Sequence, residues 1–151
     1  MKVIEVDEKQ IYGISTRTIN ANEMNPETAK IGKLWEKFDN EVSVNYQGGE
    51  RVYGVYYDYE SDANGEFNVL AGTEKADSSL EKVTIQKGKY FVFEGKATSP
   101  DDNARVQVVV DTWREVWRYF NNEESEYKRA YKTDFEHYKN QTDIHIYISI
   151  V

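Results

Sequence analysis

The segment Asp134-Phe135-Glu136-His137-Tyr138 places a carboxylate among aromatic side chains. In an extended strand alternate side chains share a face, so Glu136 and Tyr138 lie together, opposite Phe135. If Phe135 points toward the helices of the domain, Glu136 points away from them. A single carboxylate between rings suits a bulky organic cation, because such a cation is weakly hydrated and each ring face adds roughly 0.5 to 2 kcal/mol of cation–π attraction. The alternative, that Glu136 is an ordinary solvated strand residue, stays open on the pattern alone.

Further aromatic residues could form the walls of the same site. By the same alternation, Tyr56 and Asp58 share a face of an earlier strand, so two arms that each carry a ring and an acid are expected to flank a groove. The candidate ligand-binding residues are Glu136, Tyr138, Tyr56, Tyr90, Phe91, Phe93, Trp113 and Trp117. The two tryptophans belong to a helical apolar stripe, which usually faces the core. Tyr90, Phe91 and Phe93 cannot all face one side of a strand, so at least one must lie elsewhere.

Other kinds of reactive site have no support in this sequence. It contains no Cys, no glycine-rich phosphate loop and no Gly-x-Ser-x-Gly nucleophile motif. Its two histidines, His137 and His145, fall on neighbouring strands, but no third metal ligand accompanies them. We therefore expect no cofactor and no metal site.

Charge and composition narrow the class of partner. The chain has 151 residues, with 19 Lys plus Arg against 27 Asp plus Glu, for a formal net charge of −8. This balance argues against direct nucleic-acid binding and against binding to an anionic membrane. The longest nearly apolar run, residues 146–151, is far shorter than the roughly 20 residues that cross a bilayer. The charged N-terminal stretch is unlike a secretory signal, so a cytoplasmic location is expected.

The size of the chain predicts one domain over residues 1–151. An internal repeat of about 1–75 and 80–151 is expected, because an offset of 78 residues aligns Trp35 with Trp113 together with several other aromatic pairs. Each half begins with an extended stretch, continues into a helical pattern and finishes with two more extended stretches.

Each half contains one predicted helix. The first is expected to begin at Asn25-Pro26-Glu27, where Asn suits the N-cap and Pro the first helical position. Its apolar stripe is Ile31, Leu34, Trp35 and Phe38, at helical spacing. The second is expected to begin with Ser99 as its N-cap and to stop at Asn121-Asn122.

Six extended stretches accompany these helices, at residues 3–18, 53–59, 66–72, 82–97, 131–138 and 143–151. The last places alternate isoleucines on one face, which is typical of a half-buried strand. The sequence thus predicts an α+β fold, a pseudo-two-fold duplication of a β-α-β-β unit. Its antiparallel sheet is expected to carry two main helices on one face and a ligand groove on the other, because two helices cannot cover both faces.

Several motifs resemble those of a known group. They are Ile31-Gly32-Lys33-Leu34-Trp35, Val52-Tyr53-Gly54-Val55-Tyr56-Tyr57, Phe67-Asn68-Val69-Leu70-Ala71-Gly72, Trp113-Arg114-Glu115-Val116-Trp117 and, most specifically, Asp134-Phe135-Glu136-x-Tyr138. With these motifs the whole chain resembles the GyrI-like superfamily, the effector-binding domains of AraC-type and MerR-type regulators. That superfamily includes the Rob C-terminal domain, the multidrug-sensing BmrR domain, DNA gyrase inhibitory proteins and free-standing cation-binding proteins of integron cassettes.

The resemblance implies that Glu136 lies in a pocket and meets cationic drugs, as the matching glutamate does in many members. The chain departs from the family at its final strand, which commonly reads Ile-Pro-Val or Ile-Pro-Ile, whereas this chain has Ile148-Ser149-Ile150. Pairing at that edge is therefore expected to differ. No DNA-binding domain is expected before Met1 or after Val151, which argues against direct transcriptional control unless a partner supplies the DNA contact.

The leading functional hypothesis is a free-standing small-molecule binding domain for lipophilic or aromatic cations, and not an enzyme. A first alternative is a hydrolase of strained electrophilic small molecules, as some relatives are described, with Glu136 as general base. A second is a protein-interaction module like the gyrase-inhibiting relatives, in which acidic runs such as Glu123-Glu124-Ser125-Glu126 imitate DNA toward a protein partner. The sequence leaves the natural ligand and the oligomeric state open.

Overall fold

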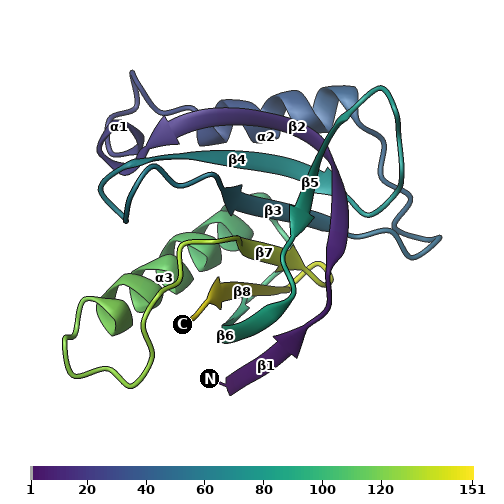
Figure 1. Cartoon of the computed structure of the whole chain (residues 1–151). Coiled ribbons are helices and arrows are strands. Elements are labelled where there is room, and N and C mark those ends of the chain that lie inside the picture. The colour runs from purple at the N-terminus through teal and green to yellow at the C-terminus, as the bar shows by residue number, and fades with distance from the viewer. Residues whose placement is uncertain (1) are drawn as a thin grey trace.

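The computed structural model describes residues 2–151 as an α+β fold with one eight-stranded antiparallel sheet (Figure 1). The strands are β1 (Lys2–Val6), β2 (Lys9–Ile19), β3 (Val52–Tyr57), β4 (Glu66–Thr73), β5 (Glu81–Ile85), β6 (Gly88–Lys96), β7 (Asp134–Tyr138) and β8 (Asp143–Ser149). The helices are α1 (Asn20–Glu23), α2 (Ile31–Glu41) and α3 (Asp102–Phe120). The predicted α+β class and antiparallel sheet are confirmed. Within residues 2–151, no helix combines the length and the apolar content that a membrane crossing requires.

The strand order is β1-β6-β8-β7-β3-β4-β2-β5, so the two halves of the chain occupy corresponding places on either side of the β3–β7 pair. Each half contributes a long strand, a helix and a hairpin, as predicted. Each also contributes a short edge strand that pairs with the other half, β1 with β6 and β5 with β2. These short strands arise because the predicted strands 3–18 and 82–97 are interrupted at Asp7–Glu8 and Gln86–Lys87.

The sheet curls (Figure 1), and one of its faces, called the inner face below, packs on itself. Phe135 lies at its centre, stacked on Tyr147 with ring centroids 4.4 Å apart and meeting Tyr90 edge-on at 5.5 Å. The buried residues of the inner face are Val6, Ile11, Tyr53, Val55, Leu70, Val83, Ile85, Tyr90, Val92, Phe135 and Tyr147. This cluster forms a core from strands alone, without any helix.

Both long helices cover the opposite face, called the helix face below. α2 packs against β2 and β4, and α3 packs against β6 and β8. The prediction that the helices and the groove lie on opposite faces is wrong, because the groove described below lies between the helices and the sheet. The physical reason is the curl: the inner face buries Phe135 against other strands, so this ring does not need a helix to cover it, and Glu136 takes the helix face.

The first long helix begins later than predicted. Asn25 does order a turn, with its Oδ1 accepting a hydrogen bond from the amide of Glu27 at 3.0 Å, but α2 starts only at Ile31. The Glu23 carboxylate accepts hydrogen bonds from the backbone amides of Lys30 at 2.8 Å and Ile31 at 3.1 Å. Glu23 therefore satisfies the amides of the helix N-terminus that Asn25 was expected to cap.

The second long helix agrees more closely with its prediction. Asp101, rather than Ser99, is its N-cap and accepts a hydrogen bond from the amide of Ala104 at 2.9 Å. The Ser99 hydroxyl donates to Asp101 instead, and so supports the cap. The helix ends at Phe120, with Asn121 as its C-cap, where the sequence predicted the stop.

Candidate functional site

Glu136 lies in the middle of β7 on the helix face, and only 1% of the residue is exposed. Its carboxylate accepts three hydrogen bonds. Oε2 accepts from the Tyr56 hydroxyl at 2.8 Å and from the Trp113 indole N–H at 2.7 Å, and Oε1 accepts from the Tyr138 hydroxyl at 2.8 Å. All three donors are aromatic side chains, so the carboxylate is enclosed by rings.

Several elements meet at this carboxylate. Antiparallel pairing places Gly54 of β3 directly opposite Glu136, and Tyr56 follows two residues later on the same face. α3 lies over the second half of the sheet and brings the Trp113 indole to the carboxylate. α2 contributes Trp35, whose ring lies beside Gly54. The site therefore exists only where the two halves of the chain join.

The negative charge on Glu136 is stabilised by the dipoles of its three hydrogen-bond donors. Burial raises the pKa of Glu136 above its ordinary value of 4.5, and the hydrogen bonds from Trp113, Tyr138 and Tyr56 oppose that rise because they stabilise the charged form. Among residues 2–151, no Lys, Arg or His forms an ion pair with this carboxylate. A buried carboxylate with no counter-ion gains the most when a cation arrives.

The phenols at the site remain protonated donors. Burial and, after it, the nearby Glu136 charge raise the pKa of Tyr56 and of Tyr138 well above the usual value of 10.0. Any negative charge at the site is therefore carried by the carboxylate and not by a phenolate.

A groove opens between the helices and the sheet beside Glu136. Its volume of about 320 Å³ is large enough for a small organic molecule. It is lined by Asn20, Glu23, Met24, Ile31, Tyr56, Tyr59, Ala63, Phe67, Val109, Val110, Trp113, Arg114, Trp117 and Arg129. Tyr56 and Trp113 both line this groove and both donate to Glu136. The carboxylate thus lies behind these two side chains and does not itself line the groove.

A second hollow, of about 250 Å³, lies against Tyr138. Its lining residues are Tyr46, Arg51, Arg105, Tyr138, Asn140 and Gln141. The guanidinium carbon of Arg105 lies 6.0 Å from the centroid of the Tyr138 ring. Tyr138 therefore separates Glu136 from a basic hollow, whereas Tyr56 and Trp113 separate it from the aromatic groove.

The structure brings four of the eight predicted ligand-binding residues into one hydrogen-bonded group, namely Glu136, Tyr138, Tyr56 and Trp113. Trp117 joins them in the groove wall, with its ring centroid 6.2 Å from that of Trp113. The two helical tryptophans therefore face the groove, although their stripe is the one that covers the core.

The remaining three predicted residues lie away from the groove. Phe91 and Phe93 are on the helix face but pack beneath α3 in a cluster with Val116. Tyr90 points to the inner face, where its hydroxyl donates to the Gln86 carbonyl oxygen at 2.6 Å. The alternation along β6 therefore separates Tyr90 from the other two, as the pattern required.

The second acid expected at the groove is not there. Asp58 follows the last residue of β3 with a φ of 49°, and its exposed side chain accepts a hydrogen bond from Asn68 at 3.3 Å. The prediction that Asp58 flanks the groove is wrong because side-chain alternation holds only within the strand, and β3 ends at Tyr57.

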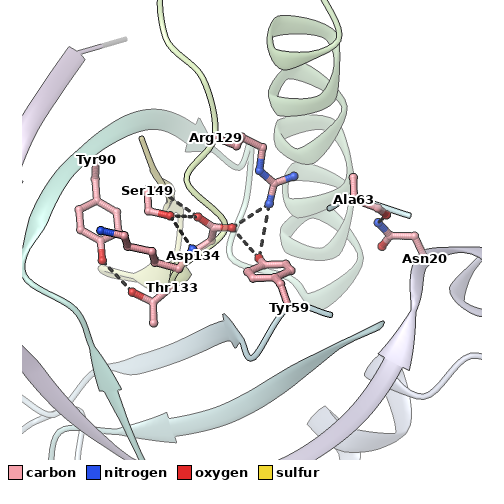
Figure 2. A network of polar contacts seen from close by, with 9 residues as sticks. Asn20, Tyr59, Ala63, Tyr90, Arg129, Thr133, Asp134 and Ser149 are labelled. Carbon is pink, nitrogen blue, oxygen red and sulfur yellow. Dashed lines mark hydrogen bonds and ion pairs between the residues drawn. The ribbon is translucent and has the colours of Figure 1, made fainter. Parts of the chain in front are cut away.

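The buried acid of this region is Asp134, which forms a polar network beside the groove (Figure 2). Its Oδ2 accepts hydrogen bonds from Arg129 Nη2 at 2.7 Å and from the Tyr59 hydroxyl at 2.5 Å. Its Oδ1 accepts from the backbone amide of Ser149 at 2.8 Å and from the Ser149 hydroxyl at 3.1 Å. Arg129 also lies over the Tyr131 ring, 4.4 Å from its centroid.

Trp35, Gly54 and Arg129 belong to this region but were not among the predicted site residues. The internal repeat, which aligns Trp35 with Trp113, was a sequence signal that could have placed Trp35 near the site. A glycine inside a strand, such as Gly54, often marks the close approach of another group. No sequence signal marks Arg129, because it lies outside the regular elements and reaches Asp134 only in the folded chain.

Comparison with known proteins gives concordant results. The family model Cass2, described as integron-associated effector binding protein, matches residues 2–150. An integron cassette protein from the mobile metagenome of Vibrio cholerae, solved by crystallography, has 38% sequence identity and a TM-score of 0.84, over 99% of this chain and 95% of that chain.

Two further proteins also match over nearly the full length. The structure of SAV2435 bound to tetraphenylphosphonium has the same fold, with a TM-score of 0.69 and 16% identity over 99% of this chain and 93% of that chain. The Bacillus subtilis (strain 168) protein YobU, which is named provisionally as a transcriptional regulator, is 26% identical over 163 residues, covering 98% of this chain and 96% of that protein.

Proposed function

Because the chain belongs to the Cass2 family of integron-associated effector binding proteins, we propose that its effector is a lipophilic or aromatic organic cation and that Glu136 is the charge partner of this cation.

The observation that carries the proposal is the burial of Glu136 without a basic partner, among residues 2–151, inside a group of aromatic donors. An ionised carboxylate is costly to bury alone and much less costly when a cation approaches it. A compact ammonium is strongly hydrated and loses more on entry than a cation with delocalised charge. The site therefore favours bulky cations of diffuse charge.

The groove wall links the ligand to the carboxylate. Tyr56 and Trp113 donate to Glu136 through their polar hydrogens and line the groove with their rings. Donation to an anion shifts electron density toward the ring, which strengthens the attraction between the ring face and a cation. A cation in the groove is thus attracted to Glu136 through these rings. Rotation of Trp113 would allow the cation to contact the carboxylate directly.

The fold of SAV2435, which was solved with tetraphenylphosphonium, supports a lipophilic cation as the probe. The chain has three tryptophans, so quenching of intrinsic fluorescence reports binding. Tetraphenylphosphonium is expected to bind, whereas tetraphenylborate, an anion of the same shape, is not. Equal affinity for the two ions would contradict the proposal.

The matched variants test the carboxylate itself. Glu136→Gln keeps the shape and removes the charge, and it is expected to weaken tetraphenylphosphonium binding at least about tenfold, which is about 1.4 kcal/mol. Glu94→Gln is the control, because Glu94 is an exposed carboxylate of β6 on the opposite face. An unchanged affinity in Glu136→Gln, or an equal loss in Glu94→Gln, would count against Glu136 as the charge partner.

A second candidate function, hydrolysis of strained electrophilic small molecules with Glu136 as general base, is favoured by the raised pKa of this buried carboxylate. The three donors on its oxygens argue for binding, because they stabilise the charged carboxylate and so weaken it as a base. Product formation from such a molecule, if it depends on Glu136, would establish that the protein is an enzyme. Tight binding of the molecule with no turnover would establish that the protein is a receptor.

A further inference from the structure

Arg129 offers a second polar contact in the groove, and we propose that the effector is a cation that also carries an acceptor oxygen, of the carbonyl or carboxylate type, which binds the Arg129 guanidinium. The inference rests on the proposed function, because it assigns the second end of the same ligand.

Arg129 is placed to meet such a ligand. Only 7% of its side chain is exposed, yet it lines the groove. Nη2 donates to Asp134 at 2.7 Å and lies 3.4 Å from the Tyr59 hydroxyl. Among residues 2–151, Nε is buried without a hydrogen-bond acceptor, and Nη1 donates to none of the described residues. Figure 2 shows the free end of the guanidinium directed away from Asp134, toward the side on which Asn20 and Ala63 lie.

The unused donors of Arg129 define what the ligand should bring. A guanidinium has five N–H donors in a fixed plane, and a buried donor without an acceptor is costly. An oxygen in the groove can accept from Nη1 while Nη2 keeps its bond to Asp134. A hydrocarbon cation fills the same groove but leaves this donor unsatisfied, so it should bind less well than a cation with an oxygen at that end.

The arginine does not exclude a cationic ligand, because its own charge is neutralised. Burial is the largest single effect and disfavours the charged form of Arg129, but the adjacent Asp134 carboxylate, together with Tyr59 and Tyr131, outweighs it and holds the pKa of Arg129 above its ordinary value. The pair therefore presents directed donors with no net charge. Among residues 2–151, neither Glu136, behind Trp113, nor Glu23, in the groove lining, forms an ion pair. These carboxylates and the Arg129 donor therefore recognise different parts of one molecule.

Two probe cations that differ mainly at the acceptor test the proposal. Hexyltriphenylphosphonium and (3-methoxycarbonylpropyl)triphenylphosphonium carry tails of equal length, one apolar and one with an ester. The measured quantity is the ratio of their Kd values, alkyl over ester. We expect this ratio to be at least about fivefold larger in the wild type than in Arg129→Lys, which corresponds to about 1 kcal/mol. Lysine can still pair with Asp134 but lacks the planar fork.

Arg118→Lys is the matched control, because Arg118 is an exposed arginine of α3 that does not line the groove. This variant is expected to leave the ratio unchanged. The same ratio in the wild type and in Arg129→Lys overturns the proposal. If neither cation binds the wild type, the proposed function fails instead, so the two failures are distinguishable.

If Arg129→Lys does not fold, nuclear magnetic resonance of the wild-type protein decides the matter. The ester cation should shift the side-chain N–H resonances of Arg129, and the hexyl cation should leave them close to their unbound positions. Equal shifts with both cations overturn the proposal.

Discussion

Gly54 lies directly opposite Glu136 in the β3–β7 pair, and a Cβ on Gly54 would stand 2.7 Å from Glu136 Oε1 and 3.0 Å from Cζ2 of Trp35. The missing side chain at position 54 therefore makes the space that the carboxylate occupies. Glycine weakens a strand, so its presence here indicates that room for the carboxylate outweighs the loss of strand propensity.

The first prediction concerns this space. Gly54→Ala should lower the free energy of unfolding by about 1 to 3 kcal/mol, because the new methyl group overpacks a buried site. Gly32→Ala is the control: a Cβ there meets nothing within 4 Å, and alanine in helix α2 should stabilise by about 0.5 to 1 kcal/mol. Urea denaturation measures both, and an equally stable Gly54→Ala protein would contradict the account.

The second prediction concerns the pH dependence of stability. Burial raises the pKa of Glu136 above 4.5, so the native state holds this proton more tightly than the unfolded chain. The resulting stabilisation is present below the unfolded pKa and is lost as the pH rises through the folded value. Glu136→Gln should remove this loss. As the pH rises above about 4.5, the free energy of unfolding of the variant should therefore increase relative to that of the wild type. Parallel pH profiles of the two proteins would refute it.

The third prediction concerns the hydrogen bonds to the carboxylate. Trp113→Phe and Tyr138→Phe each remove one donor and keep an aromatic ring, so each should raise the pKa of Glu136 further. Trp117→Phe should leave it unchanged, because Trp117 lines the groove without bonding Glu136. Titration of the Glu136 side-chain carboxyl resonance measures the shift. A downward shift in either of the first two variants would be inconsistent with donation to the charged form.

The fourth prediction concerns His137 on the inner-face side of β7. It stacks on Tyr53 with ring centroids 4.5 Å apart, and burial, followed by Lys9 and Lys139, lowers the pKa of His137 from 6.5 to about 4. The unfolded chain takes up this proton first, so stability falls as the pH drops from 6.5 toward 4. His137→Phe keeps a stacking ring without titration and should lose less stability over this range. Equal acid losses would contradict the assignment.

The fifth prediction concerns the final strand, where Ser149 departs from the pattern of the family that the sequence resembles. Ser149 donates both its amide and its hydroxyl to the buried Asp134, and β8 is an internal strand between β6 and β7 rather than an edge. Ser149→Pro removes both donors and should lower the free energy of unfolding by about 1 to 3 kcal/mol or more. Ser149→Ala keeps the amide bond and should cost less. A neutral Ser149→Pro substitution would disprove the role of these donors.

Local patterns predicted much of this fold because their causes are local. The alternation along β7 correctly placed Glu136 and Tyr138 on one face, and the stop of α3 at Asn121 followed from residues next to it. The start of α2 could not be found this way. Its N-terminal amides bond to Glu23, which lies on the preceding short helix and enters no local capping pattern.

Taken alone, the sequence determined which residues share a face, since side-chain alternation is a property of a single extended strand. It determined neither the direction of that face nor the partners of the acids. Only the folded sheet decided that Glu136 points to the helices, because the curl lets Phe135 pack among strands that are distant in sequence. The same holds for Arg129 and Asp134, whose pairing depends on the route of the chain around α3 and on desolvation by neighbours that no local pattern specifies.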